Sequence, residues 1–140
     1  MNRQTQEGVP NLDYLAAKHA QAVIEATQGK KASEIDNTVT KALGVLQENG
    51  VYACFLYLLA KEKENGVVVV GEMLKLLESL DFGWKAPRKE GSAEDVDTSP
   101  DKVLEHISER VTANLERLLL AKDTLEQMLI YARYGAKARR

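Results

Sequence analysis

The feature that most constrains the fold is an uninterrupted apolar run from Val51 to Ala60, directly after Asn49-Gly50. Every side chain of the run is apolar or aromatic, so a helix formed by it has no polar face and is expected to lie in a core. At about 1.5 Å per residue such a helix reaches only about half the thickness of a bilayer, which excludes a membrane span. The run therefore predicts a central buried helix around which the other elements pack.

The residues before this run predict a helix that ends at a sharp corner. Apolar residues recur there at helical spacing, at Ile35, Val39, Ala42, Leu43 and Leu46. Asn49 and Gly50 are the residue types best able to take the left-handed conformation that ends a helix, so we expect a positive φ at Gly50. The sequence predicts a helix, a corner and a second helix, with Phe55 and Leu58 fully buried.

Length and composition indicate one soluble globular domain that covers residues 1–140. The chain has 140 residues, 44% of them hydrophobic and 29% charged, which is enough to bury a core without metal or disulfide. Cys54 is the single cysteine, so no disulfide can form within the chain, and a reducing cytoplasm is the expected location. Residues 1–10 are expected to form a polar tail, which lacks the apolar stretch of a secretory signal.

Cap residues predict where the first helices begin. Asn11 is a suitable cap for a first helix that ends near Gln28-Gly29, and Ser33 is the expected cap of the second. An apolar stripe on the first helix is formed by Leu12, Leu15, Ala16, His19, Ala22, Val23 and Ala26. After the apolar run, a polar last turn is expected to end at Gly66. The valines Val67–Val70 suit a strand, but no second strand is available to pair with it, so we expect a helix that ends near residues 81–83.

The second half of the chain is predicted to hold a loop and then helix. Residues 84–99 are charged and lack periodicity, which indicates a mobile loop. Ser99 as cap and Pro100 at the first helical position open the next helix. Its apolar pattern continues to Ala136, as one long helix or as two with a break within residues 110–114. The fold class predicted is all-α, a single compact domain and a bundle of about six helices.

The chain lacks the sequence patterns of common catalytic sites. The two histidines, His19 and His106, are not at metal-ligand spacing from one another or from Cys54. A di-iron site would need a Glu-x-x-His pair, but Val103 is the residue three positions before His106. Glu105-His106 and Glu109 are expected to form a solvated surface cluster. No glycine-rich phosphate loop or nucleophile elbow is present. We therefore expect no enzymatic activity, no cofactor, no metal site and no small-molecule substrate.

The tyrosines leave two interpretations open. Tyr52 and Tyr57 are expected in the core. Tyr131 and Tyr134 lie three residues apart beside arginines, so they suit either packing or stacking on nucleic-acid bases.

Three segments resemble a known protein family. These are Ala16-Ala-Lys-His-Ala20, the helix-corner-helix from Leu43 to Tyr57, and the last helix from Leu118 to Ala138, which carries apolar, aromatic and basic residues and closes on small alanines. Together they resemble the small all-helical subunit of the type III-B CRISPR effector, the Cmr complex of antiviral defence. The match leaves out the tail and the loop Lys85–Ser99.

This resemblance implies a non-catalytic subunit that stacks along the backbone subunits, contacts copies of itself in the filament and helps hold guide and target RNA. Because the net charge is −2, a basic RNA-binding face requires segregated charges. Its candidate residues are Lys18, Lys41, Lys122, Arg133, Lys137, Arg139 and Arg140. Arg133, Lys137 and Arg140 share one face of a continuous helix. The alternatives are a helical adaptor without RNA contact and the related type III-A small subunit.

Overall fold

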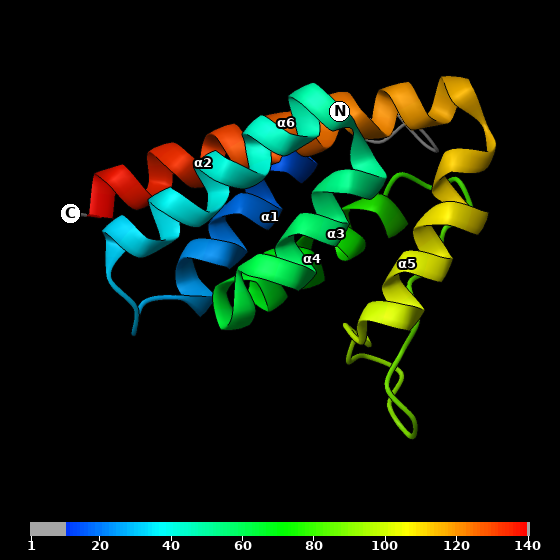
Figure 1. Cartoon of the computed structure of the whole chain (residues 1–140), viewed down its shortest axis with the longest axis horizontal. Helices are drawn as coiled ribbons and strands as arrows, with labels where there is room; N and C mark the ends of the chain where they lie inside the picture. Colours follow the sequence, from blue (N-terminus) through cyan, green and yellow to red (C-terminus); the bar gives the residue numbers. More distant parts are fainter. Residues whose placement is uncertain (1–10, 140) are drawn as a thin grey trace, which may run out of the picture.

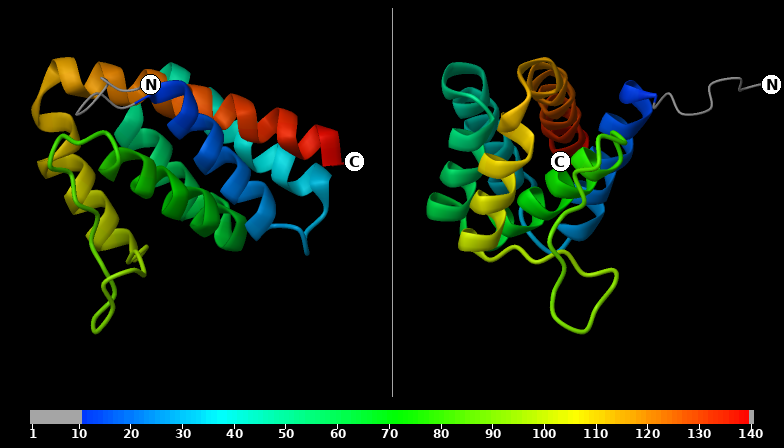
Figure 2. Two further views of the ribbon diagram at one scale, coloured as in Figure 1. Left: turned by 180° about the vertical axis from the view of Figure 1, so that it is seen from behind. Right: turned by 90° about the vertical axis from the view of Figure 1, so that its right-hand side faces the viewer.

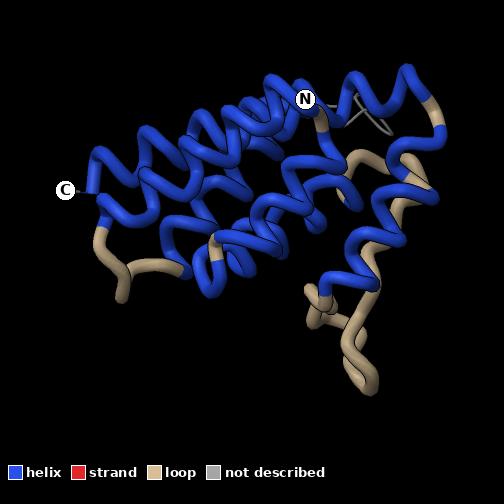
Figure 3. The backbone as a smooth tube through the Cα atoms, viewed as in Figure 1, coloured by secondary structure: helices blue, strands red, loops and turns tan. Residues whose placement is uncertain are grey.

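The computed structural model describes residues 11–139 and folds them into helices joined by loops (Figures 1 and 3). The elements are α1 (Leu12–Ala26), α2 (Ala32–Asn49), α3 (Val51–Lys61), α4 (Lys63–Glu78), α5 (Pro100–Glu109), the 3-10 helix η2 (Val111–Ala113) and α6 (Leu115–Arg139). No strand occurs in this range, so the predicted all-α fold is confirmed. The predicted polar tail, residues 1–10, and Arg140 lie outside the described residues. None of the described helices combines the length and the hydropathy that a membrane span requires.

The long helix α6 contacts both α1 and α2 and lies between them over its C-terminal part (Figure 2, right). α3 and α4 pack against each other, α3 also against α2, and α4 also against α1. α5 contacts α3 and lies at a steep angle to α6 at the end of the molecule opposite the C-terminus (Figure 1). The two ends of α6 therefore have different surroundings, because only its C-terminal part lies between α1 and α2.

Small side chains let α6 approach its neighbours closely. Ala121, Ala132 and Ala136 are fully buried on the inner face of α6. At Gly135, a Cβ atom would lie 2.9 Å from the Cγ1 atom of Ile24 on α1, closer than side chains pack. The alanine-rich end of the chain is thus an interior packing surface as well as the carrier of basic residues.

The apolar run forms α3, but the prediction that this helix is buried all round is wrong. Phe55 and Leu58 are fully buried, as predicted. Tyr52 and Leu56, however, are 40% and 45% exposed. The physical reason is that α2, α4 and α5 cover only part of the α3 surface, and apolar side chains on the remaining part stay at the surface.

A single residue, Gly50, makes the corner between α2 and α3. Its φ of +97° and ψ of −175° lie in a region that is essentially reserved for glycine, which confirms the expected positive φ. Its N–H donates to the Leu46 carbonyl at 3.0 Å, and its carbonyl accepts from the Cys54 N–H at 3.1 Å. Gly50 therefore ends one helix and begins the next.

Two of the predicted cap residues do not act through their side chains. The Asn11 Oδ1 atom accepts from the Tyr14 N–H at 3.0 Å, as expected. Ser33 is the wrong residue, because α2 already begins at Ala32 and Lys31 is in the extended cap position. Ser99 does precede α5, but its hydroxyl donates to the Asp97 carboxylate at 2.6 Å instead of capping the helix.

Of the two possibilities for the last part of the chain, the break is confirmed. α5 ends at Glu109, η2 follows, and Asn114 then caps α6, accepting from the Arg117 N–H at 3.0 Å on its Oδ1 atom.

The valine run is helical, as expected, but Gly66 does not end a helix. α4 begins at Lys63, so Gly66 lies inside its first turns. A Cβ atom at Gly66 would lie 2.4 Å from the carbonyl oxygen of Leu58. The glycine is needed because α3 and α4 approach each other there, and the interpretation of Gly66 as a helix end was wrong for this reason.

The predicted loop, residues 84–99, is attached to the helices at several points. Trp84 and Val96 are buried. The Arg88 guanidinium donates to both carboxylate oxygens of Glu78, at 2.7 and 3.0 Å, and Arg88 also forms an isolated antiparallel bridge with Val96. These contacts hold both sides of the loop against the rest of the fold, and the mobility of the loop stays a prediction.

Candidate nucleic-acid interface

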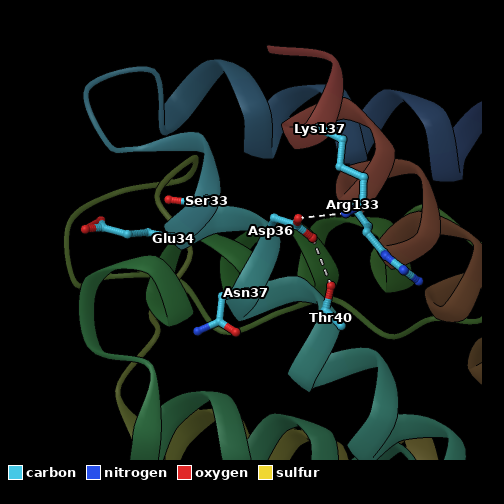
Figure 4. Close-up of a pocket in the computed structure, with 7 residues that line it drawn as sticks. All are labelled: Ser33, Glu34, Asp36, Asn37, Thr40, Arg133 and Lys137. Atoms are coloured by element: carbon cyan, nitrogen blue, oxygen red, sulfur yellow. Dashed lines mark hydrogen bonds and ion pairs between the residues drawn. The ribbon is translucent and has the colours of Figure 1, made fainter. Parts of the chain in front are cut away.

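A polar cleft lies between the beginning of α2 and the last turns of α6 (Figure 4). It has a volume of about 500 Å³. Its lining is mostly polar or charged and consists of Ser33, Glu34, Asp36, Asn37, Thr40, Arg133 and Lys137. Two of the predicted RNA-binding residues, Arg133 and Lys137, thus lie at the same cleft.

Lys137 takes part in a network that joins α6 to α2. Its Nζ atom lies 3.0 Å from the Oδ2 atom of Asp36, and the other oxygen of this carboxylate accepts from the Thr40 hydroxyl at 3.0 Å (Figure 4). The Asp36 side chain is 11% exposed, whereas that of Lys137 is 41% exposed. The lysine therefore binds a mostly buried carboxylate while it remains accessible from the cleft.

Arg133 carries a charge that no described carboxylate pairs with. Within residues 11–139 it forms no ion pair, and its Nε atom is buried without a hydrogen-bond partner. In Figure 4 its side chain extends away from the pair of Asp36 and Lys137. Its guanidinium carbon lies 5.9 Å from the ring centroid of Tyr134. The guanidinium of Arg133 is therefore available to bind an anionic ligand at the cleft.

A second hollow adjoins the cleft at Ser33, which lines both. Its other lining residues are Gln28, Lys30, Lys31, Ala32 and Arg139. The two lysines follow α1 in the chain and were not among the predicted binding residues. Two adjacent lysines in the sequence are a signal for a basic site, but the sequence does not show that this linker lies beside the end of α6. The structure places these two lysines in one hollow with Arg139, beside the cleft of Arg133 and Lys137.

Arg139 has a structural contact in this hollow. Its guanidinium donates to the backbone carbonyls of Ile24 at 2.9 Å and of Lys30 at 3.2 Å, which fixes the end of α6 against the α1–α2 linker. Lys30 itself lies 2.6 Å from Glu64, and the hydrogen bond to this carboxylate raises the pKa of the lysine. Arg139 and Lys30 are therefore partly engaged within the fold.

Three of the remaining predicted basic residues lie elsewhere on the surface. Lys18 on α1 and Lys41 on α2 are exposed, and Lys122 on α6 is half-buried. In the part of the chain that the structure describes, none of the three forms an ion pair. None of them lines the cleft or the hollow beside it. Arg140 is outside the described residues.

The tyrosines separate into packed and exposed side chains. The Tyr131 hydroxyl donates to Asp13 on α1, and this hydrogen bond raises the pKa of the tyrosine. Tyr57 is half-buried and donates to Glu62, and burial is the main cause that raises its pKa to about 12. Tyr52 is partly exposed, contrary to its expected place in the core, and Tyr134 is 61% exposed. Of the two tyrosines beside arginines, only Tyr134 is available to a ligand.

The histidines lie in separate places. His19 is buried and its Nδ1 atom is 2.9 Å from the Glu72 carboxylate. His106 is half-buried, so the prediction of a solvated surface cluster is wrong for this residue. Burial lowers its pKa, and the nearby Arg110 lowers it further. Among residues 11–139, no group of three or more His, Cys, Asp and Glu side chains is placed to hold a metal ion.

Comparisons with protein-family models, with curated proteins and with solved structures found no match for this chain.

Proposed function

We propose that this protein is the non-catalytic small subunit of a cytoplasmic type III-B CRISPR (Cmr) complex, and that it contacts RNA through the backbone phosphates. The proposal starts from the three sequence segments that resemble this family. The observation that carries the RNA contact is the guanidinium of Arg133, which pairs with no carboxylate of residues 11–139 and lies at a cleft that it shares with Lys137. Lys31 and Arg139 extend the basic surface from there.

Phosphate contact without base recognition suits a protein of this kind. In RNA-guided complexes the sequence is read by base pairing, and the protein recognises the backbone. Guanidinium is well suited to phosphate because its donors form a planar fork. Lys137 supplies a second charge one helical turn away from Arg133. Two cations at this spacing suit successive phosphates of one strand.

Exposed leucines at the other end of α6 support contact with protein subunits. Leu115 is 68% exposed and Leu119 is 53% exposed, and their spacing of four residues places them on one face. Leu120 beside them is 36% exposed. Exposed apolar groups of this kind are typical of protein interfaces. We propose that the partners are the backbone subunits and copies of the same chain, with RNA at the opposite end of α6.

The second candidate function is a helical adaptor that binds proteins but not RNA. The same leucines favour it, as do the carboxylates of Glu34 and Asp36, which balance the formal charges of Arg133 and Lys137 at the cleft. The related type III-A small subunit shares the chemistry of the first candidate.

Binding of a labelled single-stranded RNA to the full chain at low salt tests the proposal. We expect measurable affinity that falls when Arg133 and Lys137 are both changed to glutamine. Changing Lys85 and Lys102, which are exposed in the loop and on α5, removes the same charge and serves as the control. An affinity that is absent at low salt would support the adaptor instead.

A further inference from the structure

We propose that Tyr134 is a stacking platform for an unpaired RNA base, next to the phosphate contacts of Arg133 and Lys137. This inference rests on the proposed function, since it assigns a further binding residue to the same RNA-contacting surface.

Tyr134 is the exposed tyrosine on α6. Its side chain is 61% exposed, and within residues 11–139 its hydroxyl forms no hydrogen bond. Tyr131, one turn earlier, is held by Asp13, and the Trp84 ring packs edge-on against Phe82 at 5.0 Å. Apart from the Arg133 guanidinium near its ring, Tyr134 is mostly exposed, so it can offer an aromatic face to a ligand.

The position of Tyr134 links it to the cleft. The guanidinium carbon of Arg133, a residue that lines the cleft, lies 5.9 Å from the ring centroid of Tyr134. Lys137 follows Tyr134 by three residues and is therefore its neighbour on the helix surface. An aromatic face beside two cations matches the chemistry of a nucleotide, which carries a flat base next to charged phosphates.

Stacking is also consistent with the proposal that the protein binds RNA without recognising its base sequence. Every base has a π-face, so an aromatic platform binds bases with little sequence preference. The bases of a duplex already stack on one another, so the platform selects an unpaired nucleotide. The predicted ligand is single-stranded RNA, or an unpaired nucleotide at the end of a duplex.

The test compares three variants of the full chain in binding to a labelled single-stranded oligoadenylate at low salt. Tyr134→Ala should weaken binding by about 5- to 150-fold, the range expected for loss of one stacked base. Tyr134→Phe keeps the ring and should stay within about twofold of the unchanged chain, because the hydroxyl is not used. Tyr14→Ala is the matched control, since Tyr14 is 59% exposed but no arginine of residues 11–139 lies over its ring, and it should leave binding unchanged.

A second probe separates stacking from a structural role. On an oligonucleotide of the same length without bases, Tyr134→Ala should bind as the unchanged chain does. An equal loss on both probes would overturn the inference, because the ring would then act only by holding Arg133. The inference also fails if Tyr134→Ala binds oligoadenylate as tightly as the unchanged chain while the double variant Arg133→Gln with Lys137→Gln binds it more weakly. That result would leave the proposed function intact. If the unchanged chain binds neither probe, the proposed function fails and the stacking inference with it.

Discussion

Lys137 in the last turns of α6 and Asp36 near the beginning of α2 are 101 residues apart in the sequence and 3.0 Å apart in the structure. Their ion pair joins the two helices, and it also occupies one of the two cations at the cleft. A phosphate that binds Lys137 must therefore share it with Asp36 or displace it.

Asp36→Asn should strengthen RNA binding and weaken the fold. The change removes the carboxylate that competes with phosphate for Lys137. It also weakens the hydrogen bond between Lys137 and Asp36, which we expect to lower the unfolding free energy by about 1–2 kcal/mol. The loss should not be larger, because the lysine is exposed to solvent. RNA affinity at low salt and urea unfolding measure the two effects. Weaker RNA binding in a folded variant would show that Asp36 positions Lys137 for the ligand.

Gly44 within α2 and Gly50 at its end should respond to alanine with opposite signs. Gly50→Ala forces a side chain into the conformation at φ +97°, which should cost about 1–3 kcal/mol. At Gly44 no neighbouring part of the fold lies within 4 Å of the place that a Cβ atom would take, so Gly44→Ala should stabilise the chain by about 0.5–1 kcal/mol. Thermal unfolding of both variants measures the difference. Equal effects would contradict the assignment of the corner to Gly50.

The stability cost of truncating a side chain of α3 should depend on whether the side chain lies on the buried or the exposed face of the helix. Phe55→Ala should cost about 3–5 kcal/mol, because the fully buried ring leaves a cavity. Leu56→Ala, on the exposed side of the same helix, should stay within about 0.5 kcal/mol of the unchanged chain. Denaturant unfolding gives both values. A large cost at Leu56 would mean that another surface covers this side of α3.

His106 should make the fold less stable in mild acid. Its pKa is lowered in the folded chain by burial and by Arg110, so below its ordinary value of 6.5 the unfolded chain binds protons more strongly. Its contribution to stability is present above that pH and is lost as the pH falls through the folded pKa. Urea unfolding between about pH 7.5 and 5 measures this loss. His106→Gln should make the unfolding free energy depend less on pH. If the pH dependence is unchanged in this variant, it arises from other titratable groups.

The sequence was most informative where one residue and its nearest neighbours decide the structure. Asn11 acts through its side chain and Gly50 and Pro100 through their backbone conformation, and all three mark the helix ends predicted. The burial of α3 was overestimated because burial depends on which distant helices cover a surface. Gly66 was misinterpreted for the same reason, since it is required by a close approach to Leu58 that no local pattern reveals.

The candidate site was predictable only in part. The spacing of Arg133 and Lys137 already predicted that they share a helix face, and the structure places both at one cleft. The pairing of Lys137 with Asp36 could not be foreseen, because it depends on how α6 packs on α2. The same holds for the proximity of Lys31 to this end of α6.

The most direct test of the central claim, that RNA phosphates bind at Arg133 and Lys137, is the salt dependence of RNA affinity. The full chain, the double variant Arg133→Gln with Lys137→Gln, and the control Lys85→Gln with Lys102→Gln would be titrated with a single-stranded RNA between about 50 and 200 mM salt. Each lost phosphate contact lowers the slope of log affinity against log salt by about 0.7, so the double variant should flatten it by about 1.4 and the control should leave it unchanged. A slope that stays the same in the double variant, or falls equally in the control, would contradict the claim.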